Sequence, residues 1–437
     1  MFSFFKSAVH LPVNSAETEV QNTLRYKKLR LSVFLSATFG YGLYYVCRLS
    51  INVMKKPLID NGILTESQLG IVGSALFFSY AIGKLVNGFL VDRSNIKRFM
   101  AFGLLVSAII NICLGFIDSF LFFTILWALN GWFQSMGAPP AIVSLSRWFT
   151  NKERGTYYGF FSASHNLGEA FTYVFTALAV SYIGWQWGFI GAGIAGMLGV
   201  FLIVLFLHDS PESMGLKPVM NKVSKDKLGG LQLSVLKMPA IWILSLSSAF
   251  MYISRYAITS WGIFFLQEHR HYGTVVASSI ISVSAVSGIF GNIFSGWVSD
   301  KFFNGKRNVP ALIFGLLNTG SIALFLLVPN GHQWVEIFAM VVFGFSIGVL
   351  ICYLAGLMAV DIVPKSVSGA AIGIVGIASY LGAGLQDIIT GKLIQSNKTV
   401  ADGAPTYNFS AIIWFWIGSA LLSCLLCLFI WNAKIKD

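Results

Sequence analysis

The chain has 437 residues, of which 56% are hydrophobic and only 11% are charged, and its mean hydropathy is +0.72. Soluble domains have about a quarter of their residues charged, so this composition excludes a soluble fold and predicts a polytopic membrane protein. The formal net charge is +12. The positions of the basic residues, described below, argue against a nucleic-acid partner.

Twelve apolar segments have the length of about 20 residues that a helix needs to cross a bilayer. We expect these spans at 31–52, 69–91, 99–117, 121–144, 156–180, 186–207, 240–266, 275–297, 310–329, 334–359, 369–391 and 408–432. The longest polar stretch follows the sixth span. The sequence therefore predicts an all-α membrane protein with a cytoplasmic N-terminal segment at 1–30, six-helix halves at 31–207 and 240–437, and a cytoplasmic linker at 208–239.

Lysine and arginine are distributed unevenly between the two sides of the predicted membrane. If both termini are cytoplasmic, 22 of the 30 Lys and Arg residues lie on the cytoplasmic side. The outer loops hold five, namely Lys55, Lys56, Arg270, Lys392 and Lys398. This excess follows the positive-inside rule, so we expect both termini in the cytoplasm and a lipid bilayer around the chain. The lack of added domains and targeting signals fits a bacterial inner membrane.

Two features recur at nearly the same offset, which indicates that the halves are parallel repeats. Arg48 and Arg255, each inside an apolar span, lie 207 residues apart. Asp92 and Asp300, each followed by a basic residue at the end of a span, lie 208 residues apart. In transporters built this way the substrate site lies between the repeats, near mid-membrane. We also expect the two acidic-basic pairs to latch the cytoplasmic side through charge contacts.

Arg48 and Arg255 are the strongest candidates for a binding site. An arginine near the bilayer centre costs about 2.5–3.5 kcal/mol even on lenient insertion scales, so it usually faces a partner, a cavity or a substrate. The planar guanidinium fork suits phosphate oxygens, which accept two parallel hydrogen bonds. The alternative is that each arginine pairs with an internal carboxylate, such as Glu169 or Asp387, and holds the bundle together. We expect the pair to bind one anionic substrate.

Tyrosines and a lysine near the arginines are candidates for the same site. Tyr41 and Tyr45 share a helical face with the first arginine, and Tyr252 lies three residues before the second. Tyr80 and Lys84 are four residues apart on the second span. Lys84 is either a third cation of the site or a snorkelling or internally paired lysine.

The fifth and eleventh spans add further candidates. His165 and Asn166 lie early in the fifth span, and a histidine there can follow the charge of a titrating phosphate near neutral pH. Glu169, one helical turn on, could keep His165 protonated or neutralise an arginine; a structural ion pair is the alternative. Asp387 is a candidate either for the site or for an internal ion pair.

No motif of an enzyme, a metal site or a nucleotide site is recognisable in the sequence. We therefore expect no enzymatic activity and no cofactor. Without a site for ATP, the energy for any transport must come from a gradient.

Seven motifs occur in order along nearly the whole chain, at 40–48, 91–95, 130–140, 152–155, 164–168, 299–307 and 380–382. With these motifs the chain resembles the organophosphate–phosphate antiporter family of the major facilitator superfamily. That family includes glycerol-3-phosphate and hexose-6-phosphate transporters and a hexose-phosphate sensor. The resemblance implies the twelve-helix major facilitator fold and a phosphate-gripping role for Arg48 and Arg255. It also implies that Gln134 lines the pocket with His165, Lys84 and the candidate tyrosines.

The chain departs from the family pattern at positions near the expected site. Leu49 stands where the family often has lysine, Ala138 where it often has tryptophan, and Glu169 where many members have a small residue. Ala383 and Gln386 replace the aspartate and lysine of hexose-phosphate transporters. The resemblance thus carries over well for the phosphate-binding part of the site, while the organic part of the substrate stays unspecified.

We therefore expect a secondary transporter that works as a monomer. It would exchange an organophosphate, with a sugar phosphate such as glucose 6-phosphate as the first candidate, for inorganic phosphate by alternating access. Two alternatives stay open. A membrane sensor that binds sugar phosphate and signals to a partner kinase needs the same pocket. A proton-coupled anion carrier, suggested by Glu169 and Asp387, would take up its substrate without internal phosphate.

Overall fold

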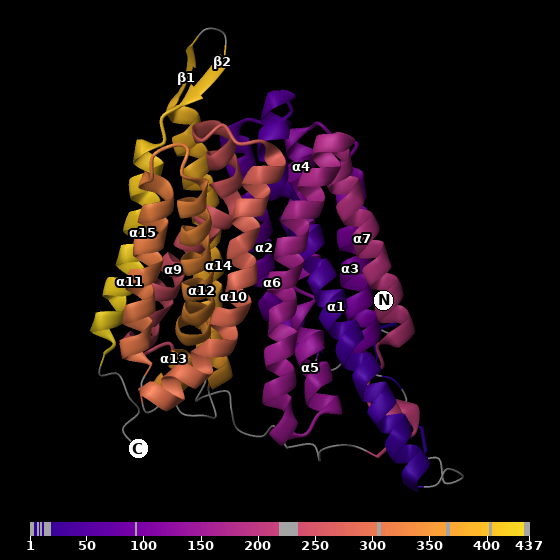
Figure 1. The fold of residues 1–437 in the computed structure, drawn as a ribbon. Helices are drawn as coiled ribbons and strands as arrows, with labels where there is room; N and C mark the ends of the chain where they lie inside the picture. Colours follow the sequence, from indigo (N-terminus) through magenta and orange to yellow (C-terminus); the bar gives the residue numbers. More distant parts are fainter. Residues whose placement is uncertain are drawn as a thin grey trace.

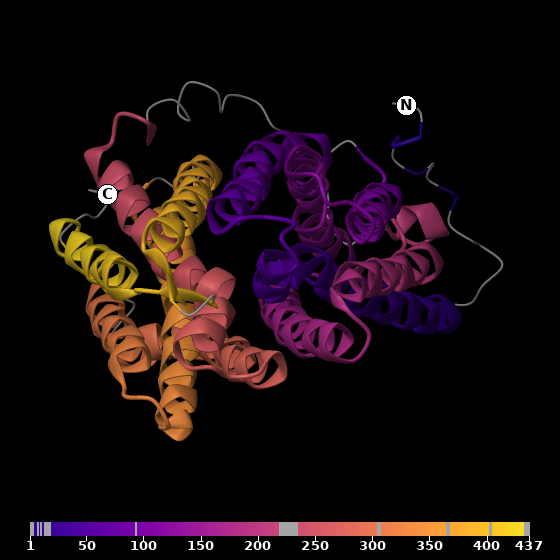
Figure 2. The same cartoon turned by 90° about the horizontal axis from the view of Figure 1, so that it is seen from above.

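A computed structural model describes residues 4–6, 8, 11–12, 19–91, 94–217, 235–303, 307–363, 368–401 and 404–431. Its described part is almost entirely helical, and Figures 1 and 2 show the helices as two groups side by side. Figure 2 sets α1 to α7 apart from α9 to α15. The predicted all-α bundle is confirmed.

The first group consists of α1 (Glu19–Asp60), α2 (Glu66–Val91), α3 (Ile96–Leu114), α4 (Phe120–Gln134), α5 (Ala138–Trp148), α6 (Asn151–Tyr182) and α7 (Trp185–Phe206). A short 3₁₀ turn, η1 (Glu212–Met214), follows. The predicted linker at 208–239 is described only at its two ends, because residues 218–234 lie outside the described residues.

The second group consists of α9 (Pro239–His269), α10 (Thr274–Phe302), α11 (Asn308–Leu327), α12 (Gln333–Cys352), α13 (Met358–Ile362), α14 (Ser368–Ser396) and α15 (Ser410–Phe429). A π-helical turn, η2 (Tyr353–Leu357), joins α12 to α13. Two antiparallel strands, β1 (Lys398–Ala401) and β2 (Ala404–Tyr407), form a hairpin between α14 and α15. This hairpin projects from one end of the bundle (Figure 1).

All twelve predicted spans correspond to helical segments of the described chain, but two of them are interrupted. The span predicted at 121–144 is divided into α4 and α5 just before Pro139 and Pro140. Prolines lack the N–H that a continuous helix needs, so they lie in the first turn of α5. The span predicted at 334–359 continues from α12 through η2 into α13. Nine helices of the described chain meet criteria of length and apolar composition for crossing a membrane.

The two groups of helices pack together along three helix pairs, α2 with α14, α6 with α10 and α1 with α9. We call the end that carries the β1–β2 hairpin the hairpin face. The opposite end, where α7 ends and α9 begins, is the linker face. These two faces differ in how the groups are joined.

A buried ion pair joins the two groups near the hairpin face. Lys55 Nζ of α1 lies 3.7 Å from Asp387 Oδ1 of α14, and both side chains are at most 2% exposed. Lys55 also donates a hydrogen bond to Ser260 Oγ of α9 at 2.8 Å, and the Trp261 indole N–H donates to Asp387 at 2.7 Å. The prediction of Lys55 in an outer loop was therefore wrong. Helix α1 continues to Asp60, and a carboxylate from the other group compensates the lysine inside the bundle.

Helices α2 and α14 approach closely at this ion pair. A Cβ atom on Gly73 of α2 would overlap the Asp387 carboxylate, so only glycine fits there. Close approach through small residues is the usual way in which helices pack in lipid.

Further contacts close the hairpin face. Glu66 at the start of α2 accepts hydrogen bonds from Lys398 Nζ at 2.7 Å and Tyr407 Oη at 2.6 Å, both from the β1–β2 hairpin. Lys56 of α1 pairs with Glu268 of α9. The hairpin thus ties the second group of helices to the first.

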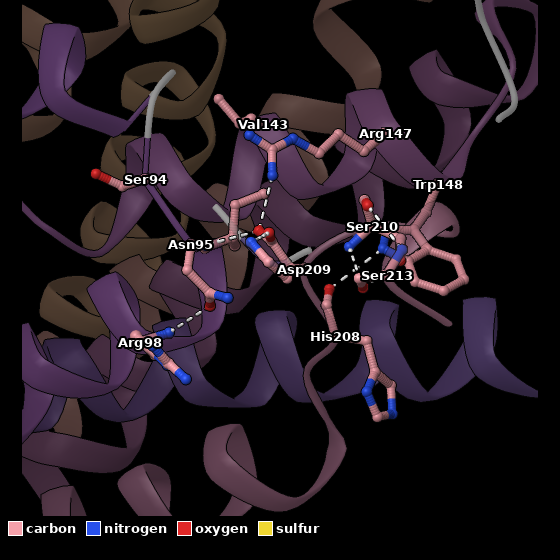
Figure 3. A network of polar contacts seen from close by, with 12 residues as sticks. Ser94, Asn95, Arg98, Val143, Arg147, Trp148, His208, Asp209, Ser210 and Ser213 are labelled. Atoms are coloured by element: carbon pink, nitrogen blue, oxygen red, sulfur yellow. Dashed lines mark hydrogen bonds and ion pairs between the residues drawn. The ribbon is translucent and has the colours of Figure 1, made fainter. Parts of the chain in front are cut away.

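At the linker face, the ion pairs of the described residues stay within one group of helices. Asp209, after α7, pairs with Arg147 of α5 at 2.7 Å (Figure 3). It also accepts a hydrogen bond from the Ile96 N–H of α3. Arg307 pairs with Asp361 within the second group. The predicted latch stays a prediction, because residues 92–93 and the side chain at position 300 lie outside the described part.

The buried pair leads to a prediction about stability. Asp387→Asn leaves the Lys55 ammonium without a counter-charge inside the bundle, which costs about 3–5 kcal/mol. We expect a clear fall in Tm for the purified protein in detergent. The double variant Lys55→Met/Asp387→Leu removes both charges and recovers most of that loss.

Asp60→Asn is the matched control, because Asp60 pairs with Lys56 while half exposed. Exposed pairs contribute about 0–1 kcal/mol, so this variant keeps nearly the full Tm. An Asp387→Asn protein as stable as Asp60→Asn would contradict a stabilising role for the buried pair.

Candidate functional site

Arg48 lies in the middle of the bundle, surrounded by aromatic rings. Its Cζ atom is 4.3 Å from the ring centre of Tyr80, 5.5 Å from that of Tyr380 and 5.6 Å from that of Tyr45. Its Nη2 donates a long hydrogen bond of 3.4 Å to Tyr256 Oη. No carboxylate of the described residues lies at ion-pairing distance, and the buried Nε atom has no hydrogen-bond partner there. The cation is held by the negative faces of rings, with hydrogen-bonding capacity to spare.

Arg255 approaches the same place from the other group of helices. Its Cζ atom lies 5.3 Å from the Tyr256 ring centre and 5.9 Å from that of Tyr252. Its Nη2 lies 3.6 Å from Glu169 Oε2 of α6. Tyr256 therefore contacts both arginines, Arg48 through its hydroxyl group and Arg255 through its ring. The alternative of an internal carboxylate partner holds for Arg255 but not for Arg48.

The charges of this central cluster do not balance. Arg48 and Arg255 supply two positive charges at 3% and 7% exposure, and Glu169 supplies one negative charge at 4%. A buried charge without a counter-charge is unfavourable, so the cluster favours the approach of an anion. An ion pair of 3.6 Å also leaves most of the Arg255 fork free for shorter hydrogen bonds.

The predicted tyrosines form a connected set around the two arginines. Tyr41 and Tyr45 pack edge to face with ring centres 5.6 Å apart. Tyr80 of α2 lies 4.7 Å and Tyr252 of α9 lies 5.4 Å from Tyr380 of α14. Three helices from both groups thus meet at the Tyr380 ring.

Two tyrosines of this set were missed as site residues. The sequence predicts neither Tyr256 nor Tyr380 as a site residue, and Tyr380 enters only as the first residue of the motif at 380–382. Their spacing to the arginines in the sequence does not show that they face Arg48, because that contact crosses between the two groups of helices. The motif at 380–382 was the one available signal.

His165 and Glu169 lie on α6 beside the cluster, but they have different partners. The His165 ring centre is 5.4 Å from that of Tyr45. Glu169 contacts Arg255 and accepts a hydrogen bond of 3.0 Å from Tyr173 Oη. The contacts of the described residues thus favour the alternative in which Glu169 neutralises an arginine. They do not favour the one in which Glu169 keeps His165 protonated.

A cleft leads from the cluster towards the linker face. It has a volume of about 440 Å³ and lies between α2 and α5 of one group and α14 of the other. Lys84 is exposed on its wall, with Nζ 5.4 Å from the Tyr380 ring centre. Because Tyr380 also contacts Arg48, the wall of the cleft carries a positive charge directly beside the central rings. The rest of the described lining is mostly apolar, so Lys84 supplies the charge of this cleft.

The structure does not bring two of the predicted residues to the arginines. Gln134, at the end of α4, donates a hydrogen bond of 3.3 Å to Ser107 Oγ of α3, because the last turn of α4 faces that helix. Asp387 is occupied by its ion pair with Lys55 near the hairpin face. Asn166, by contrast, lines a small cavity together with Glu169 and Arg255.

Comparisons with known proteins agree with this architecture. The family profile described as Major Facilitator Superfamily matches residues 33–386. The membrane sensor protein UhpC of Salmonella typhimurium is 32% identical, over 99% of this chain and 98% of its own. A probable hexose phosphate transport protein of Chlamydia pneumoniae is also 32% identical, over 99% and 98%.

A solved structure shows the same fold. It is a bacterial homologue of the human lysosomal transporter Spinster, in an inward-facing and occupied conformation. The TM-score is 0.72 at 18% identity, over 93% of this chain and 98% of that chain. At this identity the similarity concerns the fold alone.

Proposed function

Because the chain belongs to the organophosphate:phosphate antiporter family of the Major Facilitator Superfamily, we propose that it exchanges an organophosphate for inorganic phosphate by alternating access. A sugar phosphate such as glucose 6-phosphate is the first candidate for the organic substrate. The name of the Chlamydia relative supports this choice.

The observation that carries the proposal is the meeting of Arg48 and Arg255 at Tyr256. Each arginine comes from a different group of helices, and each keeps free donors. A phosphate dianion placed between them neutralises both cations and accepts hydrogen bonds from both forks. Tyr45, Tyr80, Tyr252 and their neighbours would supply hydroxyl donors around it.

The remaining predicted residues take supporting roles in the proposal. Lys84 draws the anion into the cleft, and His165 with Tyr41 lines the side of the site on α1 and α6. Gln134 and Asp387 are assigned no contact with phosphate in the conformation described above, because Ser107 and Lys55 occupy them.

Alternating access follows from the contrast between the two faces. The buried pair of Lys55 and Asp387 and the partly exposed pair of Lys398 and Glu66 close the hairpin face, whereas the cleft opens towards the linker face. For substrate to leave on the hairpin side, the pair between Lys55 and Asp387 and the contacts of Glu66 must separate while the linker face closes. Phosphate bound to both arginines would hold the two groups together during this rocking motion.

The same proposal includes the membrane topology. We place the linker face and both termini in the cytoplasm, since most of the basic residues lie in the segments on that side. The site lies within one chain, which fits a transporter that works as a monomer. A bacterial inner membrane is the proposed location, as the bacterial relatives suggest.

A membrane sensor is the second candidate function, because the relative named as a sensor is as similar as the one named as a transport protein. The two functions share a binding site but differ in flux. Uptake of labelled phosphate by proteoliposomes separates them. A protein that binds phosphate and moves none is a sensor.

We expect Arg48→Lys and Arg255→Lys each to lower the rate of phosphate exchange by about 100-fold, because lysine keeps the charge but loses the two-pronged hydrogen bonds to the anion. Exchange of labelled phosphate in phosphate-loaded proteoliposomes measures this rate. Arg30→Lys is the matched control, since Arg30 pairs with Glu153 at the linker face. Exchange at the control's rate in either variant would rule out the arginine pair as the phosphate site.

We also expect uptake to require phosphate or organophosphate inside the vesicles. Without an anion between the arginines, the carrier retains its buried excess charge and changes conformation slowly. The measurement compares phosphate-loaded with phosphate-free vesicles, with and without a protonophore. Rapid uptake into phosphate-free vesicles that the protonophore abolishes would favour the proton-coupled carrier over the exchanger.

A further inference from the structure

A small cavity lies beside Arg255, at the contact between the two groups of helices. It is enclosed by α6 on one side and by α9, α10 and α12 on the other. Arg255, Glu169, Asn166 and Thr259 all contribute to its wall. A hydroxyl group of a substrate whose phosphate is held by Arg255 could therefore reach this cavity.

The wall of this cavity has hydrogen-bonding capacity that the protein does not use. Asn166 and Thr259 are 5% and 4% exposed. Asn166 Nδ2 and Thr259 Oγ1 are both buried without a hydrogen-bond partner. Buried polar atoms are nearly always paired, and leaving one unpaired is unfavourable. The cavity has a volume of about 20 Å³, which is room for about one water-sized group. The two unpaired atoms therefore fit a single hydroxyl group of a ligand.

Glu169 adds hydrogen-bond acceptors to the same cavity. Its carboxylate accepts one hydrogen bond from Tyr173 Oη and faces Arg255 at 3.6 Å. An ionised carboxylate only accepts hydrogen bonds and has about four acceptor sites. When phosphate takes the Arg255 fork, the oxygen that faces Arg255 becomes available to a hydroxyl group of the same ligand. A negatively charged group on the ligand would instead be repelled.

From this arrangement, and resting on the proposed function, we propose that Glu169, Asn166 and Thr259 form a specificity subsite for one hydroxyl group of the organic part of the substrate. The subsite accepts neutral, hydroxyl-bearing organophosphates. It rejects organophosphates that carry a carboxylate. The discrimination against a carboxylate comes mainly from the charge of Glu169, whereas Asn166 and Thr259 form hydrogen bonds with a hydroxyl group of the substrate.

Two compounds with the same carbon skeleton test the proposal. Glycerol 3-phosphate and 3-phosphoglycerate differ only in a terminal CH₂OH or carboxylate group. Each competes with labelled phosphate for exchange in phosphate-loaded proteoliposomes, and the readout is the ratio of their half-inhibiting concentrations. We expect the unmodified protein to favour glycerol 3-phosphate by about tenfold or more, a difference typical of one desolvated charged contact.

Glu169→Gln keeps the shape and removes the charge, so we expect it to lower this ratio by about tenfold. Glu169→Asp keeps the charge and should preserve most of the discrimination. A ratio that stays unchanged in Glu169→Gln overturns the proposal, because both compounds would then bind independently of that charge.

Thr259→Val tests the hydroxyl-binding part. We expect this variant to weaken the binding of glycerol 3-phosphate, relative to that of inorganic phosphate, by about fivefold to tenfold, the effect of one lost hydrogen bond. Thr176→Val is the matched control, because Thr176 of α6 is also buried without a partner but does not line this cavity. Equal behaviour of the two threonine variants overturns this part.

Failure of the subsite is distinguishable from failure of the proposed function. If the subsite is wrong, phosphate exchange persists while the ratios do not respond to the variants. If the unmodified protein exchanges no phosphate at all, the proposed function fails and this inference fails with it.

Discussion

The burial of two arginines where the two groups of helices meet is the constraint on which the rest of the structure depends. Within the described part of the chain, Arg48 interacts with aromatic rings and the Tyr256 hydroxyl group but with no carboxylate, while Arg255 has Glu169 at a distance of 3.6 Å. These contacts compensate the two cations only in part. A bound anion would compensate the excess positive charge of this interior and so lower its free energy. That property supports the proposal that phosphate binds at the centre of the bundle.

Near the hairpin face, buried charges of opposite sign are paired with each other. There Lys55 and Asp387 neutralise each other, with Ser260 and Trp261 completing their hydrogen bonds. A neutral pair can keep two groups of helices closed without requiring a ligand, and it can separate when water reaches it. The contrast between a neutral ion pair near one end and two only partly compensated arginines in the middle supports the proposal that the first closes the bundle and the second binds the substrate.

In the proposed site, Glu169 would link the binding of phosphate with the choice of substrate. It lies on α6 of one group and contacts Arg255 on α9 of the other. As a counter-ion it lowers the free-energy cost of burying Arg255. As a carboxylate it would repel a negatively charged group on the organic part of the substrate. The departure of the sequence from the family pattern at this position thus has a physical meaning that the pattern alone does not provide.

The sequence by itself was enough to predict the class of fold, the twelve helical segments and the two arginines as candidate site residues. The length of apolar segments, the distribution of basic residues and the cost of a buried guanidinium can all be judged from the local sequence. The sequence also placed Tyr41, Tyr45 and Arg48 on one face through helical spacing. It could not place Tyr256 and Tyr380 against Arg48, nor pair Lys55 with Asp387, and it put Lys55 in a loop. Those contacts join helices from opposite groups, so they depend on how the groups are rotated and shifted against each other. No spacing within one helix contains that information, and only the packing of the whole bundle decided it.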